Sequence, residues 1–148
     1  MPDDFSVIYW DASAVLSVLF KDSYSENAVA WVEKEGFHFI STLVYAEVCA
    51  VIARLKKERI LSRALVAASF ETLEQGPWRY LTAAPEWEIT KHLSEKWSLR
   101  GADLWHLAAV KSLQKELPEL TLLTFDMRLQ KAANGENLGS ITSPTAVK

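Results

Sequence analysis

Short runs of β-branched and aromatic residues alternate with longer helical patterns along the chain, and this alternation constrains the fold more than any other feature. SVIYW (6–10) and TLLTF (121–125) have the length and composition of strands, and an aspartate follows each of them. HFIS (38–41) and WRYLTA (78–83) are further candidate strands. Strands that alternate with helices predict an α/β fold with a mostly parallel central sheet and helices on both faces.

The segments between these runs carry apolar residues at helical spacing. They cover 25–35, 42–60, 62–75, 85–97 and 102–117, and shorter helical patterns follow residues 11 and 126. A last, weaker strand is expected over 138–142, after a turn. The chain has no repeat, low-complexity segment or linker that would divide it, so we expect one domain over 1–148.

Composition narrows the function classes. The single cysteine, Cys49, excludes an internal disulfide, and the three histidines lack the spacing of zinc ligands. No segment has the apolar length of a membrane span, and MPDDF is acidic where a secretory signal would be basic, so we expect a cytoplasmic protein. A net charge of −3 gives no global attraction to nucleic acid, which would need a local basic patch.

Two aspartates stand at the edge of the expected sheet where ligands usually bind, because Asp11 and Asp126 follow strands directly. Thr124 lies two residues before Asp126, on the same face of the strand, where its hydroxyl can steady that carboxylate. The alternative for each aspartate is simpler. Either one can cap the helix that follows it.

Two more acids stand out on helices. Glu47 lies within the apolar stripe of the 42–60 pattern, so its side chain should point inward, either to a functional site or to a buried salt bridge with Arg54 or Arg100. Asp103 opens the 102–117 helix, where a capping or dipole role is the alternative. If these two and the two strand-end aspartates converge, each close pair repels by about 4 kcal/mol at 4 Å and an effective dielectric near 20.

A cluster of four carboxylates needs a cation. Carboxylate oxygens without histidine or cysteine partners suit Mg²⁺ or Mn²⁺. No loop has the acidic spacing of an EF-hand, which disfavours Ca²⁺.

In their order along the chain, YWDASAVL, STLVYAEV, LRGADLWHLAAV and LLTFDMRLQKAA resemble the PIN domain family, and in particular the VapC-like toxin ribonucleases of type II toxin–antitoxin pairs. The resemblance spans nearly the whole chain. It implies a three-layer α/β/α sandwich and a metal-dependent endoribonuclease in which Mg²⁺ or Mn²⁺ activates the water that hydrolyses the RNA phosphodiester. Asp11, Glu47 and Asp103 match the three family acids that hold the metal, and Asp126 matches the less strictly kept fourth.

The resemblance gives other residues provisional roles. Ser13 matches a family hydroxyl that can bond a carboxylate or a water at the metal, although a serine also suits the start of a helix. Glu47 or Asp103 can assist as a base. His106 lies one helical turn after Asp103, where it can touch substrate or a carboxylate, and we expect it to be structural or to support a carboxylate rather than to be catalytic.

RNA requires cations despite the acidic total. Arg100 and Arg128 lie closest in sequence to the predicted site, and a second basic group surrounds the end of the 42–60 helix, although such a run is often only a solvated face. That group comprises Arg54, Lys56, Lys57, Arg59 and Arg63. Trp31 and Trp87 are candidates for contacts with another chain. The family implies a homodimer and a small cognate antitoxin that blocks the site.

Other functions predict other residues. A phospho-accepting receiver domain needs paired acids after its first strand and an acceptor aspartate after a middle strand, and a haloacid-dehalogenase-type phosphatase needs an aspartate at position 13, which is Ser13. The remaining alternative is a PIN-like RNA- or protein-binding module without nuclease activity. Loss of an acid would favour that module, and all four acids are present.

Overall fold

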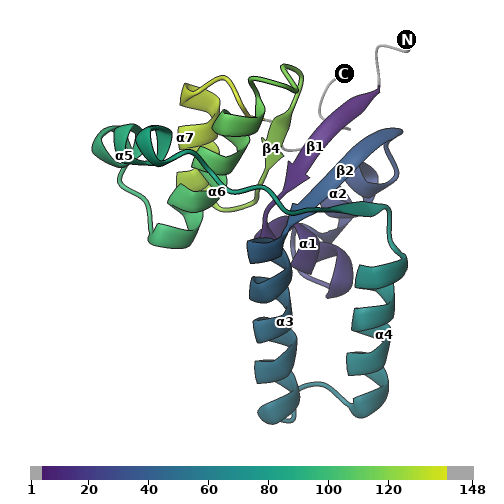
Figure 1. The fold of residues 1–148 in the computed structure, drawn as a ribbon. Helices are drawn as coiled ribbons and strands as arrows, with labels where there is room; N and C mark the ends of the chain where they lie inside the picture. Colours follow the sequence, from purple (N-terminus) through teal and green to yellow (C-terminus); the bar gives the residue numbers. More distant parts are fainter. Residues whose placement is uncertain (1–4, 140–148) are drawn as a thin grey trace.

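The computed structural model describes residues 5–139 and contains the expected alternation of strands and helices (Figure 1). The first half of the chain forms β1 (Ser6–Trp10), α1 (Ala12–Leu19), α2 (Ser25–Val32), β2 (Gly36–Ser41), α3 (Thr42–Lys57) and α4 (Arg63–Gln75). The second half forms β3 (Trp78–Leu81), α5 (Trp87–Lys96), α6 (Gly101–Leu113), β4 (Thr121–Leu123) and α7 (Met127–Gly135).

The four strands form one parallel sheet in the order β3-β2-β1-β4. β1 lies between β2 and β4, and its residues 7–10 are all buried, so helices cover both of its faces. Gly36 starts β2 with a φ of 148°, and a side chain there would collide with the carbonyl oxygen of Ser6. The mostly parallel sheet predicted from sequence is therefore confirmed, and every pairing between its named strands is parallel.

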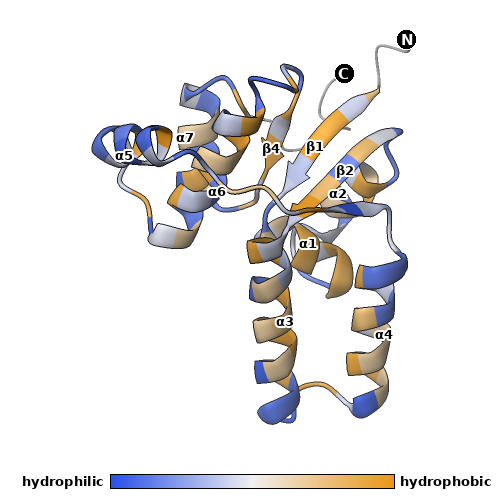
Figure 2. Ribbon diagram, viewed as in Figure 1, coloured by the Kyte–Doolittle hydropathy of each residue, from blue (hydrophilic) through white to orange (hydrophobic). Residues whose placement is uncertain are grey.

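Two groups of helices flank the sheet (Figure 1). α6 and α7 contact β4, and α5 packs against α6; on the other side α1 packs against α2, α3 and α4. α3 and α4 run as an antiparallel pair beyond the sheet, and Figure 2 shows that their far ends are hydrophilic whereas α1 is largely apolar. No helix within residues 5–139 is long and apolar enough to cross a bilayer.

Two predicted strands end earlier than expected. β3 stops at residue 81, and β4 stops at 123 because the next backbone amides bond to side chains: Phe125 N donates to Ser13 Oγ at 3.0 Å, and Asp126 N donates to Thr124 Oγ1 at 3.0 Å. Of the predicted 138–142 strand, the structure has a single bridge between Leu122 and Gly139, and 140–142 lie outside the described residues.

The tryptophans divide between core and surface. Trp10, Trp31 and Trp78 are buried, so the expected contact of Trp31 with another chain is wrong: this ring completes the core beneath α2. Trp87 is 92% exposed at the start of α5 and stays a candidate for such a contact.

One buried acid, Glu136, joins the helices α5, α6 and α7. Glu136 follows α7 and accepts hydrogen bonds from Lys96 Nζ at 2.7 Å and Trp97 Nε1 at 2.8 Å, and Lys111 Nζ lies 3.3 Å from its other oxygen. Burial alone would raise the pKa of Glu136, but these contacts together lower it to about 2. The carboxylate therefore holds α5, α6 and the end of α7 together as an ionised group.

Candidate active site

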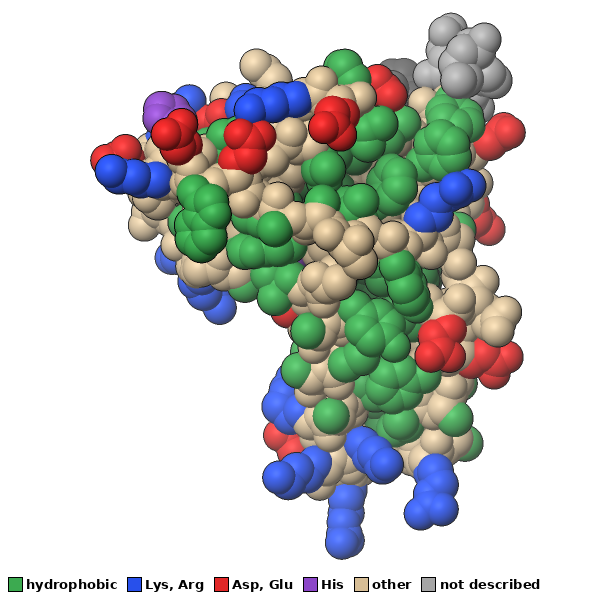
Figure 3. Space-filling view, in the orientation of Figure 1, with side chains coloured by type: hydrophobic (Ala, Val, Ile, Leu, Met, Phe, Trp, Pro, Cys, Tyr) green, Lys and Arg blue, Asp and Glu red, His purple; other side chains and the backbone are tan. Residues whose placement is uncertain are grey.

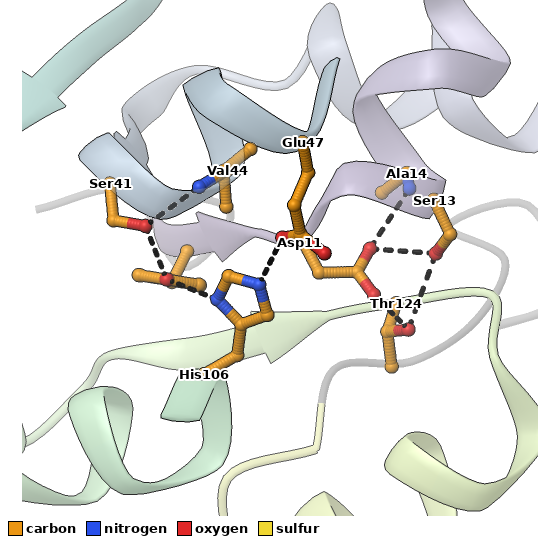
Figure 4. A network of polar contacts seen from close by, with 9 residues as sticks. Asp11, Ser13, Ala14, Ser41, Val44, Glu47, His106 and Thr124 are labelled. Atoms are coloured by element: carbon orange, nitrogen blue, oxygen red, sulfur yellow. Dashed lines mark hydrogen bonds and ion pairs between the residues drawn. The ribbon is translucent and has the colours of Figure 1, made fainter. Parts of the chain in front are cut away.

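Four elements bring the predicted acids to the carboxyl edge of the sheet. Asp11 lies between β1 and α1, and Asp126 lies between β4 and α7. Glu47 is in the second turn of α3, which follows β2 directly, and Asp103 is in the first turn of α6. Figure 4 shows the side chains of Asp11, Glu47 and His106 pointing into the same region from different elements. This is the edge at which α/β sheets bind ligands.

Asp11 is almost fully buried and held by three donors (Figure 4). Its Oδ1 accepts from Ser13 Oγ at 2.7 Å and from Ala14 N at 2.9 Å, and its Oδ2 accepts from Thr124 Oγ1 at 2.5 Å. The Ala14 contact confirms that Asp11 caps α1. Burial raises the pKa of Asp11, although the three hydrogen bonds and the nearby His106 oppose this effect.

Thr124 does not steady the carboxylate that the sequence suggested. Its hydroxyl donates to Asp11, and it accepts from the backbone amide of Asp126. The strand ends one residue before Thr124, so the strand alternation that related its side chain to that of Asp126 no longer applies. Ser13 has the predicted contact with a carboxylate.

Glu47 has a partner that the sequence did not suggest. His106 Nε2 lies 2.6 Å from Glu47 Oε1, so a proton lies between the two atoms. The salt bridges expected with Arg54 or Arg100 are absent from the described residues, since Arg54 pairs with Glu58 at 3.6 Å. The prediction that His106 supports a carboxylate is confirmed.

The far side of the His106 ring is anchored in the core. Its Nδ1 lies 2.7 Å from the hydroxyl of Tyr9, which donates to Ser41 Oγ at 2.8 Å. Ser41 in turn caps α3 by accepting from Val44 N at 3.2 Å. Sequence reasoning missed Tyr9 and Ser41; the available signal was a tyrosine hydroxyl within an apolar strand, which needs a buried partner.

Asp103 and Asp126 lie close enough to repel. Burial raises the pKa of Asp103, Asp126 and Glu47 raise it further, and His106 and Arg100 oppose them. Asp103 accepts no hydrogen bond from a described residue, and Arg100, rather than Asp103, occupies the N-cap of α6. Asp126 does cap its helix, because its Oδ1 accepts from the amides of Arg128 and Leu129 at 3.0 and 3.1 Å.

The donor chemistry of this edge fits a hard cation. Within residues 5–139 no three acidic, histidine or cysteine side chains form a ready-made metal site. Mg²⁺ is usually held by only one or two carboxylates together with waters and substrate phosphate, so a three-ligand group is not required. Glu47 Oε2, Asp126 Oδ2 and the Asp103 carboxyl accept no hydrogen bonds from described residues and remain free to bind a cation.

The predicted RNA-contacting cations lie in two places. The positive charge of Arg100 lies close enough to Asp103 to lower the pKa of its carboxyl. Arg128 lines a surface cavity of about 390 Å³ together with Trp97, Leu99 and Lys131. The second basic group is exposed where α3 ends and α4 begins, and its side chains are the blue ones at the bottom of Figure 3. It comprises Arg54, Lys56, Lys57, Arg59 and Arg63. Arg100 and Arg128 are therefore the cations nearer to the acids.

Comparison with known proteins gives one family. The model of the PIN domain matches residues 8–135. Ribonuclease VapC45 of Mycobacterium tuberculosis (strain CDC 1551 / Oshkosh) is 30% identical over 133 residues, which cover 86% of this chain and 90% of the relative.

Solved structures share the fold. The M. tuberculosis toxin VapC20, described as cleaving the sarcin-ricin loop, has a TM-score of 0.56 at 14% identity, with 84% of this chain and 94% of VapC20 covered. VapBC2 from Rickettsia felis, solved with a DNA fragment from its promoter, has a TM-score of 0.54 at 15% identity, with 86% and 94% covered.

Proposed function

The chain belongs to the PIN domain family, and from that premise we propose that it is a metal-dependent endoribonuclease, the toxin of a type II toxin–antitoxin pair. The observation that carries the proposal is the convergence of Asp11, Glu47, Asp103 and Asp126 at one edge of the sheet, where burial and then the charges of Asp126 and Glu47 raise the pKa of Asp103. The likeness to ribonuclease VapC45 supports RNA as the substrate.

The cation would be Mg²⁺ or Mn²⁺, held by carboxylates of the four acids Asp11, Glu47, Asp103 and Asp126 together with waters and substrate phosphate. When bound, it supplies charge that offsets the carboxylates and activates the attacking water. Asp11 is oriented by Ser13, Ala14 and Thr124 before any ligand arrives. Preorganisation of this kind avoids reorganisation during the reaction.

The remaining roles follow from exposure and charge. Asp103, with its raised pKa and half-buried side chain, is best suited to take the proton of the attacking water, and Glu47 is the second candidate base. Arg100 and Arg128 are exposed beside the acids and would contact the RNA phosphates.

The test is cleavage of a mixed RNA pool by the purified chain with Mg²⁺ or Mn²⁺, with and without chelator. We expect cleavage that the chelator abolishes and that a folded Asp103→Asn variant lacks. Glu95→Gln, an exposed acid on α5, is the matched control and should cleave normally. If the wild-type protein is folded and free of antitoxin and cuts no RNA, the alternative of a PIN-like binding module without nuclease activity takes precedence.

Partners and location complete the proposal. A cognate antitoxin is supported by the likeness to VapBC2, and a homodimer is the family expectation, for which the 92% exposed ring of Trp87 is a candidate contact. A toxin that acts on cellular RNA would work in the cytoplasm. Light scattering on wild type and Trp87→Ser tests the dimer: we expect twice the chain mass for the wild type and a lower mass for the variant.

A further inference from the structure

We propose that His106 is a positioning residue that fixes the Glu47 carboxylate for the cation, an inference that rests on the proposed nuclease function. His106 is 1% exposed and the Glu47 side chain 31%, so the contact between Nε2 and Oε1 joins the core to the surface. The contact with His106 fixes the position of Glu47 Oε1 and so orients the whole carboxylate. Its other oxygen, Oε2, is left free for a ligand.

The histidine itself is immobilised by a closed ring of contacts. Its Nδ1 meets the hydroxyl of Tyr9 on the central strand β1, and that hydroxyl donates to Ser41, the N-cap of α3. α3 also carries Glu47, so the ring returns to the helix of the acid that His106 holds. Tyr9 is 0% exposed, and no water can replace its hydroxyl without disturbing the core.

The same closed set of contacts also ties the helix that carries Glu47 to the helix that carries Asp103. Asp103 and His106 are three residues apart on α6 and share a helix face, so the contact with Glu47 ties the helix of one acid to the helix of the other. Tyr9 adds the strand that ends just before Asp11. His106 thus links the elements that carry three of the four acids, which is more than packing alone requires.

Carboxylates that bind metals are commonly oriented by a second hydrogen bond, and loss of the orienting partner typically weakens metal affinity or activity by about 10- to 100-fold. The test uses two substitutions of different reach. In His106→Asn the amide can replace Nδ1 toward Tyr9 but not Nε2, whereas in His106→Gln the longer amide can still donate toward Glu47.

The readout is Mn²⁺ affinity, measured from the free-ion electron paramagnetic resonance signal without RNA. We expect His106→Asn to bind Mn²⁺ about 10- to 100-fold more weakly and His106→Gln to recover most of the loss. His92→Gln, an exposed histidine on α5, is the matched control and should bind as the wild type does. Circular dichroism melts establish that each variant is folded at the assay temperature.

A double substitution separates positioning from general damage. If His106 acts through Glu47, His106→Asn should weaken Mn²⁺ binding less than twofold in a Glu47→Gln background. An equal loss in both backgrounds, or wild-type affinity in His106→Asn, would overturn the inference while leaving the nuclease proposal intact. A folded wild-type protein that binds no Mn²⁺ and cuts no RNA would overturn the nuclease proposal itself, and the inference with it.

Discussion

Asp11 both caps a helix and is the first of the proposed metal ligands, and Asp11→Asn separates the two roles. Asparagine is as good an N-cap as aspartate, and its Oδ1 can still accept from Ala14 N. The substitution replaces the charged Oδ2 by an amide that faces the Thr124 hydroxyl, which can act as an acceptor instead of a donor. We therefore expect the fold to survive and the metal site to fail.

The magnitude follows from the burial of the carboxylate. Burial raises the pKa of Asp11 above its ordinary value, so above that raised pKa the ionised group costs the folded state about 1.4 kcal/mol for each unit of the shift. Asparagine removes this cost and gives up the charge-assisted bond from Thr124, so we expect a change of less than about 1 kcal/mol in the free energy of unfolding, or roughly 3 °C in Tm. Asp11→Ala removes the same cost, but it also removes the cap and the acceptor of two hydroxyls, so it should be less stable than Asp11→Asn by about 3 kcal/mol, or roughly 9 °C.

The assay is thermal unfolding by circular dichroism at pH 7 with and without Mn²⁺, followed by RNA cleavage. At about 100 times its Kd, Mn²⁺ should stabilise the wild type by about 2.7 kcal/mol and should not stabilise Asp11→Asn, which should also fail to cut RNA. The reasoning is refuted if Asp11→Asn loses as much stability as Asp11→Ala, because the acid would then be structural. It is equally refuted if Asp11→Asn keeps the stabilisation by Mn²⁺.

Two further predictions concern Glu136 and the cations beside the site. The pKa of Glu136 is about 2 in the folded protein against an ordinary 4.5, so its contribution, up to about 3 kcal/mol, should be present above pH 4.5 and lost as the pH falls toward 2. In circular dichroism melts, Glu136→Gln should be less stable than the wild type at pH 7 and should show a flatter pH dependence in that window; parallel curves would contradict this. Arg100→Ala and Arg128→Ala, each in the Asp103→Asn background, should lower the salt dependence of log K for single-stranded RNA by about 0.7. Lys91→Ala, an exposed position on α5, should leave the salt dependence of log K as it is in Asp103→Asn alone. If Arg100→Ala and Arg128→Ala also keep that salt dependence, neither arginine contacts a phosphate.

The sequence was sufficient to predict the parallel sheet, because strand-length apolar runs separated by helical patterns leave few other arrangements. It could not predict where β4 ends. The TLLTF run reads as five strand residues, but the backbone amide of Phe125 bonds to the side chain of Ser13, more than a hundred residues away. A strand boundary set by such a contact is invisible to local composition.

The site was partly predictable for the same reason. Helical periodicity indicated that Glu47 points inward, but it carries no information on the element opposite. The predicted partner Arg54 lies two turns further along α3, where it is exposed and pairs with Glu58, whereas the observed partner His106 is 59 residues from Glu47. That contact exists only because α3 and α6 are brought together at the edge of the sheet.

Capping and metal binding were opposed as explanations for Asp11 and Asp126, and the geometry makes them compatible. In a parallel α/β fold, the N-terminus of a helix that follows a strand lies at the ligand-binding edge, where its dipole favours an anionic side chain. Asp126 accepts hydrogen bonds from the helix amides through Oδ1 only, so that its Oδ2 accepts none from a described residue, whereas both oxygens of Asp11 accept hydrogen bonds. Because a capped aspartate is already oriented and placed at this edge, helix capping prepares each acid for a cation instead of competing with it.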